Sequence, residues 1–294
     1  RHPFFFFFFM LKTRDIAVLC SACRYYVLNR QQIQRLHFPA DPDGRITRRR
    51  LQVRVEQKLR NRQQMLFCHP GSGTPAPVYY PTRKAAEFLA EHFEDARFLR
   101  VPAKPPIPHH TFHWLMVSDT HMAFDRAATA KDTVRIDEWI NEYDELEPNE
   151  QSPDKKFRLY TLIREIPRLV CVPDAGFVID AKGIRKAFYL ECDRNTSGVA
   201  QIAASKTPGY AAMQEGRLHT RHFPSAVDAF VVLMVAPGDK RRNALRRAIH
   251  DKPGAHLWRF ASAEDLARRI GLFDPIWYGC HHEQPTALVN AEAV

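Results

Sequence analysis

The chain has 294 residues, of which 45% are hydrophobic and 26% charged, a composition typical of a globular protein long enough for two domains. Its formal net charge of +10 indicates a polyanionic partner. No apolar run approaches the roughly 20 residues of a membrane-spanning helix, so we expect a cytoplasmic protein without a membrane partner.

The N-terminus has a basic residue before six consecutive phenylalanines, as a signal peptide would. That apolar stretch is short, however, and no small-residue cleavage site follows it. Because Met10 opens a helical pattern, we interpret residues 1–9 as disordered or as a miscalled start. The six cysteines are scattered through apolar stretches, which is the pattern of buried thiols in a reducing cytoplasm.

Residues 10–100 alternate between helical and strand periodicity. Asn29 is a good N-cap for the second helix. Three helices, a hairpin and a closing helix predict a winged helix-turn-helix domain, in which one helix enters the major groove of DNA. The expected helices are Lys12–Arg24, Arg30–Leu36, Thr47–Asn61 and Thr82–Glu91, and the expected strands are Met65–His69 and Val78–Tyr80, with turns at Pro39–Gly44 and Pro70–Pro75.

The positive charge is concentrated in the third helix of this domain. Residues 45–62 contain eight basic residues and one acid, Glu56. Leu51, Val55 and Leu59 recur on one face, and we expect the basic residues on the other. This surplus predicts binding to double-stranded DNA, and the alternative is a small helical adaptor with a solvated basic face. The predicted DNA-binding residues are Arg45, Arg48, Arg49, Arg50, Arg54, Lys58 and Arg62.

Residues 101–110 contain four prolines and predict a semi-rigid linker to a second domain over residues 111–280, with a tail at 281–294. The order of elements in this domain, α-β-β-β-α-β-α-β-α, predicts a layered α/β fold. The expected helices are Thr111–Ala128, Val199–Glu215, Lys240–His250 and Ala263–Ile270, and the expected strands are Val134–Ile140, Leu169–Ile179, Ile184–Asp193, Ala229–Val235 and His256–Phe260.

Three carboxylates in two neighbouring strands form the candidate catalytic site. Glu191 and Asp193 project to the same face of their strand. If the hairpin turns at Lys182-Gly183, then Asp174 lies opposite Glu191. Such a cluster repels itself unless it shares a proton or binds a cation, and its oxygen ligands suit Mg²⁺, for which we name Asp174 and Glu191 as ligands. The alternative is an ion-pair network that closes the strand ends.

At these residues the sequence resembles the plasmid replication-relaxation family. The resemblance is carried by "VPDAGFVID", "KAFYLECDRNTSG" and "SKTPGY", and by "TRDIAVLCSACRYYVLNRQQIQRLHF" and "VYYPTRKAAEFLA" nearer the N-terminus, and it covers residues 12 to 278. It implies a winged helix-turn-helix joined to a PD-(D/E)xK nuclease-like, that is restriction-endonuclease-like, α/β domain with a central mixed sheet. It also implies a role in replication, relaxation or mobilisation of plasmid DNA.

Carried over residue by residue, Asp174 matches the aspartate of the nuclease motif and Glu191 its acidic partner. The motif lysine should stand two residues after Glu191, where this chain has Asp193. Lys206, on the next helix, is a candidate replacement, although Pro208 removes a helical hydrogen bond close to it. The further acid that the motif takes from the first helix would be Asp119 or, alternatively, Glu142.

Three functions remain open at this point. The first is a DNA-binding accessory factor of plasmid or mobile-element replication or relaxation, which would work with replication or relaxase proteins. The second is a Mg²⁺-dependent DNA endonuclease, which would use Asp174, Glu191, Asp193 and Lys206. The third is a winged-helix transcriptional regulator with an inactive nuclease-like domain. Two interpretations also remain for the arginine-rich helix expected at Lys240–His250. It makes a second contact with DNA, or its charged face is only solvated.

Overall fold

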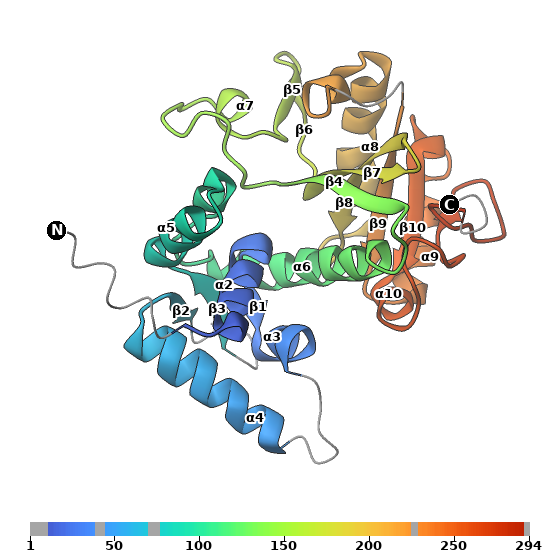
Figure 1. Ribbon diagram of the computed structural model, residues 1–294. Helices are drawn as coiled ribbons and strands as arrows, with labels where there is room; N and C mark the ends of the chain where they lie inside the picture. Colours follow the sequence, from blue (N-terminus) through green and yellow to red (C-terminus); the bar gives the residue numbers. More distant parts are fainter. Residues whose placement is uncertain (1–10, 39–44, 70–76, 225–228, 291–294) are drawn as a thin grey trace. The chain divides into compact units, whose positions relative to one another are not determined.

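The computed structural model describes residues 11–38, 45–69, 77–224 and 229–290 (Figure 1). Contacts divide the chain into two compact units, Arg1–Asp119 and Thr120–Val294, and the division falls inside the long helix α6 (Pro108–Ala128). The start at residues 1–9 and the expected turns at 39–44 and 70–75 lie outside the described residues. Within the described ranges, no helix combines the length and apolarity that crossing a membrane requires.

The first unit combines helices with a three-stranded antiparallel sheet of order β1-β3-β2. The predicted cap is present, because the Asn29 side chain accepts a hydrogen bond from the backbone N–H of Gln32 at 2.9 Å. Strand β1 was not predicted, since two residues are too short to show an alternating pattern. The elements are α2 (Thr13–Tyr25), β1 (Leu28–Asn29), α3 (Arg30–His37), α4 (Arg45–Leu51), β2 (Leu66–His69), β3 (Val78–Pro81), α5 (Arg83–His92) and the 3₁₀ helix η2 (Ala96–Arg100).

The third helix of this unit changes character midway. It continues beyond α4 as the π-helix η1 (Gln52–Arg62), in which backbone N–H groups reach carbonyls five residues back. At its end, the N–H of Gln63 donates to the carbonyl of Lys58 at 2.8 Å. We refer to α4 and η1 together as the basic helix.

The second unit is built on a six-stranded sheet of order β11-β10-β9-β8-β7-β4, which confirms the predicted α/β class with a central mixed sheet. The first three strands along the chain form an antiparallel meander, and the next two add in parallel because helices connect them. The strands are β4 (Val134–Asn141), β7 (Ala175–Ala181), β8 (Ile184–Cys192), β9 (Phe230–Ala236), β10 (Trp258–Ser262) and β11 (Tyr278–Gly279).

The single strand predicted over Leu169–Ile179 is wrong. The chain forms two strands there: β6 (Leu169–Cys171), which pairs with β5 (Thr161–Arg164) as a separate hairpin, and β7 in the main sheet. Pro173 lies at the break, and a proline cannot donate to a strand ladder. A short helix, α7 (Pro153–Lys156), precedes this hairpin.

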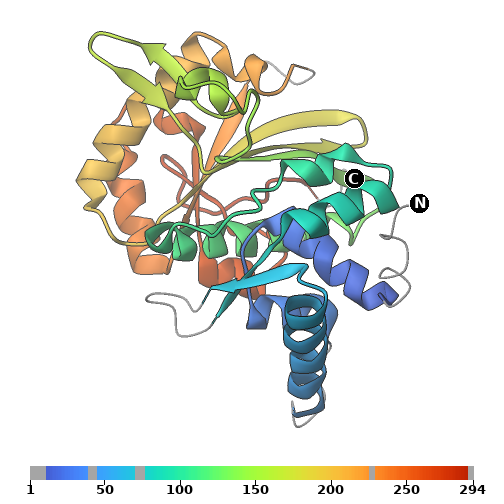
Figure 2. The same cartoon turned by 90° about the vertical axis from the view of Figure 1, so that its left-hand side faces the viewer.

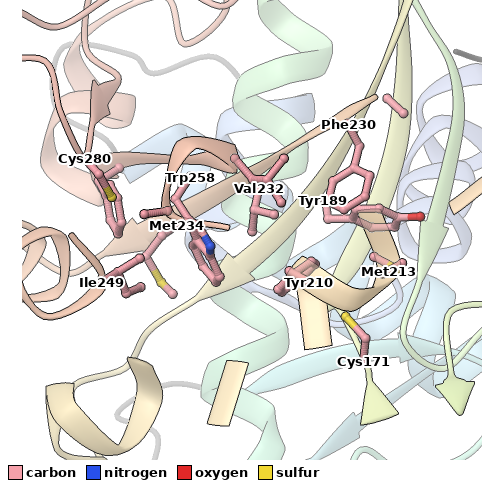
Figure 3. Packing of buried hydrophobic residues seen from close by; sticks show 14 of the residues in the cluster. Cys171, Tyr189, Tyr210, Met213, Phe230, Val232, Met234, Ile249, Trp258 and Cys280 are labelled. Atoms are coloured by element: carbon pink, nitrogen blue, oxygen red, sulfur yellow. The ribbon is translucent and has the colours of Figure 1, made fainter. Parts of the chain in front are cut away.

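Helices cover both faces of the main sheet. On one face, α8 (Val199–Glu215) and α9 (Asp239–Ile249) enclose a buried cluster with Tyr189, Val232 and Trp258 from the strands (Figures 2 and 3). On the other face, the Phe124 ring of α6 lies 5.3 Å from Phe177 of β7. The remaining helical segments are η3 (Leu218–Arg221), η4 (Ala255–Leu257) and α10 (Ala263–Arg268).

Candidate functional site

The basic helix is anchored by one apolar side. Leu51, Val55 and Leu59 are each at most 1% exposed, as their four-residue spacing predicts. Its one acid is satisfied within the unit, because Glu56 accepts hydrogen bonds from Arg30 at 2.7 Å and from the Tyr79 hydroxyl at 2.8 Å. The helix is thereby tied to α3 and β3.

Six arginines of the basic helix are exposed, and none pairs with a carboxylate of the described residues. Arg60 belongs to this set, although the prediction omitted it. Uncompensated charge gathered on one helix side is what attracts a polyanion. The six are Arg45, Arg48, Arg49, Arg50, Arg60 and Arg62.

Arg54 and Lys58 differ from the prediction, because they point toward the interior of the unit. Both bind Asp15 of α2, which is fully buried, with N–O distances of 3.0 Å and 2.5 Å, and their side chains are only 26% and 20% exposed. Burial opposes the charge on Asp15, but Lys58, a backbone N–H and Arg54 together lower the pKa of its carboxyl. The sequence pattern could not separate these two cations from the exposed arginines, because their partner lies 39 and 43 residues away.

The carboxylates of the second unit meet as the hairpin register predicts. Ala175 pairs with Leu190, which places Asp174 opposite Glu191, and the N–H of Asp174 donates to the Leu190 carbonyl at 3.1 Å. One carboxylate oxygen of Asp174 accepts the backbone N–H of Cys192 at 2.6 Å. Both carboxylates are buried, with side chains held at the end of the β7–β8 pair.

Glu191 is held by two groups of α8. The Lys206 ammonium lies 2.9 Å and 2.7 Å from its two oxygens, and the Tyr210 hydroxyl donates to Oε1 at 2.6 Å. Burial, opposed by Lys206 and reinforced by the charge of Asp174, raises the pKa of Glu191 to about 7. Lys206 also donates to the Val172 carbonyl, and about a third of its side chain stays exposed.

The contact between Lys206 and Glu191 survives Pro208, because α8 runs unbroken through the proline. Burial disfavours the charge on Lys206, but Glu191 and Asp174 outweigh it and raise the pKa of the ammonium. Tyr210 was missed by the sequence reasoning. Its position four residues after Lys206, one helical turn along, is the signal that could have found it.

Of the two alternatives for the further acid, Glu142 lies beside Asp174. It directly follows β4, its N–H donates to the Asp174 carbonyl at 3.1 Å, and oxygens of the two carboxylates lie within 4.8 Å of each other. Asp119 lies in the first unit, where it pairs with Arg35. The oxygen donors of Glu142 and Asp174 are of the kind that Mg²⁺ takes, so this pair fits a divalent cation.

Asp193 has a different role in the structure from the one expected. Its carboxylate accepts two hydrogen bonds from Arg241 of α9, at 2.6 Å and 3.1 Å. Arg242 is likewise engaged with Asp239 and Asp265, and Arg246 with the Gly279 carbonyl. Three of the four arginines of α9 therefore fasten this helix to neighbouring segments of the unit, which favours a structural role for most of its charge.

The family model described as replication-relaxation matches residues 24–225, which is more than half of the chain and includes both candidate sites. The chain belongs to the replication-relaxation family. Membership of this family associates the chain with DNA replication or relaxation. It also implies that the partners of the chain are DNA or replication proteins. Searches of curated proteins and of solved structures return no match.

Proposed function

We propose that this replication-relaxation protein binds double-stranded plasmid or mobile-element DNA through its first unit, which works as a winged helix-turn-helix. The observation that carries the proposal is the set of six exposed arginines on the basic helix, whose apolar side is buried in the unit. The hairpin β2–β3 follows that helix directly, as a wing would. A cytoplasmic location, where such DNA is found, agrees with the free state of the cysteines.

The test compares exposed arginines of the basic helix with an exposed arginine elsewhere in the first unit. Arg50→Ala removes an exposed charge and is expected to weaken binding of a DNA duplex and to lower the salt slope by about one phosphate contact. Arg100→Ala removes an exposed charge elsewhere in the same unit and serves as the matched control. Equal affinities and equal slopes for wild type, Arg48→Ala and Arg50→Ala would contradict DNA binding by this helix.

A second candidate function, a metal-dependent DNA nuclease, is favoured by the cluster of Glu142, Asp174, Glu191 and Lys206. In this proposal Asp174 and Glu142 hold a Mg²⁺ ion, which would polarise a phosphodiester and activate water when bound. Glu191 orients Lys206, and the Lys206 ammonium positions the phosphate. The Tyr210 hydroxyl donates a hydrogen bond to the Glu191 carboxylate, so that Glu191 and Lys206 each keep one orientation.

Supercoiled plasmid incubated with the full chain and Mg²⁺ or Mn²⁺ tests this second function. Nicking is expected for wild type and is expected to be lost in Asp174→Asn. Asp137→Asn is the matched control, because Asp137 is a carboxylate of the same sheet that pairs with Arg135 and Arg185 instead. Without nicking by wild type, the nuclease function would be discarded, and the cluster would be read as an ion-pair network.

A further inference from the structure

The basic helix has a stripe of side chains diametrically opposite its buried side. Buried residues recur every four positions, at Leu51, Val55 and Leu59. A shift of two residues is about half a turn in both an α-helix and a π-helix, so it leads to the opposite side. The residues reached in this way are all exposed: Arg49, Val53, Gln57 and Asn61.

This stripe differs chemically from its flanks. Val53 is apolar and yet 46% exposed, and its neighbours on the helix surface are arginines and polar residues. Arg48 and Arg60 each precede a residue of the stripe in the sequence, so they lie along one edge of it. Arg50 and Arg62 each follow a residue of the stripe, so they lie along the other edge. The helix thus presents a mixed polar and apolar centre between two edges of positive charge.

The two edges and the centre match different parts of duplex DNA. Arginines on both sides of a helix can contact the two phosphate backbones that border a major groove. In the groove, arginine pairs with guanine, glutamine and asparagine pair with adenine, and an apolar side chain contacts the thymine methyl group. The centre of the helix carries all three of these reading chemistries, in the order arginine, valine, glutamine, asparagine.

We propose that Arg49, Val53, Gln57 and Asn61 select the DNA sequence, while the flanking arginines supply affinity without selecting. The inference rests on the proposed DNA binding and goes beyond it by naming the residues that determine specificity. It assigns a target containing guanine and A·T pairs along the stretch that the helix covers. Arg54 and Lys58 take no part in selection, because Asp15 holds them inside the unit.

Selection of preferred duplexes from a random pool by the full chain, followed by affinities for every single-pair change, provides the test. Gln57→Ala is expected to lose on the order of tenfold discrimination at one A·T pair, with unchanged affinity for random-sequence DNA. Val53→Ala is expected to lose discrimination at a different pair. Arg60→Ala is the matched control, which should weaken all duplexes alike, reduce the salt slope by about one and keep every preference.

Different results would overturn the sequence selection and the DNA binding itself. Wild type that binds duplex DNA without preference, or Gln57→Ala and Val53→Ala variants that keep the wild-type preferences, would overturn the selecting stripe and leave DNA binding in place. Wild type that does not bind duplex DNA would overturn both. Because Gln57 and Val53 are exposed, their substitution leaves the core of the unit intact, and an unchanged melting temperature would verify this.

Discussion

Asp15 is a buried anchor of the basic helix. It is a fully buried carboxylate, and two cations of the helix converge on it. Removal of one member of a buried ion pair leaves the other members uncompensated, which is costly, although here the cations retain some contact with water. The pKa of Asp15 is lowered, so its stabilisation is present above the ordinary value of 3.8 and is lost as the pH falls through the lower folded-state value.

Asp15→Asn is therefore expected to lower the free energy of unfolding by about 2 kcal/mol at neutral pH, measured by urea denaturation. Asp95→Asn is the control, since Asp95 forms an ion pair with the exposed Arg97, and its loss should lower the free energy of unfolding much less than the loss of Asp15. Similar losses for the two variants would show that the Asp15 contacts contribute no more than a surface pair.

His222 predicts a pH dependence in the second unit. Its ring lies between the Tyr189 hydroxyl, at 2.6 Å, and the Thr161 hydroxyl, at 3.1 Å, and burial together with Arg221 and Arg158 lowers its pKa from 6.5 to about 4. The unfolded chain binds the proton first, so stability contributed by neutral His222 is complete above pH 6.5. It is lost as the pH falls toward 4, by roughly 3 kcal/mol in total.

Unfolding free energies of wild type and His222→Gln, measured between pH 7 and pH 4, test this prediction. The glutamine variant cannot titrate, so its stability should fall less steeply across that window. Parallel curves for the two proteins would mean that His222 does not contribute to acid sensitivity.

At this scale, sequence reasoning could predict contacts that follow from register and spacing. The hairpin turn set the opposition of Asp174 and Glu191. The family resemblance made Lys206 a candidate for the motif lysine, and the structure places its ammonium against Glu191. Contacts between remote segments could not be predicted in the same way. The pairing of Asp193 with Arg241 joins residues 48 positions apart, and its geometry depends on how α9 packs on the sheet.

Among the elements, α9 shows most clearly that tertiary contacts determine whether charged residues stabilise the fold or remain available for binding. Its arginine-rich sequence is equally compatible with a DNA contact and with a structural helix. The structure uses Arg241 for a bidentate bond to Asp193 and for a hydrogen bond to the Ser197 carbonyl, while Arg247 is exposed. Bidentate arginine–carboxylate pairs are among the stronger polar contacts in proteins.

Arg241→Ala is accordingly expected to destabilise the protein by about 2 kcal/mol, because it leaves the buried Asp193 carboxylate unpaired. Arg247→Ala removes the same charge from the same helix and should change the free energy of unfolding by less than about 0.5 kcal/mol. Chemical denaturation of the two variants is the measurement. A larger loss in Arg247→Ala than in Arg241→Ala would contradict the structural role of Arg241.

Long elements with a clear period were predicted well, and short or interrupted ones were not. The helices α2, α5, α8 and α9 and the strands β4 and β8 lie within a few residues of their predicted positions. The strands β1, β5 and β11 were missed, because two to four residues carry too little periodicity. The π-helical turn in the basic helix also has no sequence signature, since its apolar spacing of four suits an α-helix nearly as well.

For the whole molecule, the two proposed activities lie in separate units, at the basic helix and at the carboxylate cluster. We therefore expect a change in one unit to leave the function of the other unaltered. Asp174→Asn is expected to retain the wild-type affinity for duplex DNA while any plasmid nicking is lost. A parallel loss of affinity, measured by fluorescence anisotropy, would mean that the carboxylates take part in holding DNA.

The salt dependence of duplex binding by the full chain tests DNA binding by the basic helix most directly. Five arginines flank or precede the selecting stripe, and each phosphate contact contributes a slope of about −0.9 to log K against log salt concentration. A slope of about −4.5 is expected for wild type, and a slope about three units shallower for the variant with Arg48, Arg50 and Arg60 all replaced by alanine. A wild-type slope near zero, or one that the triple variant leaves unchanged, would contradict it.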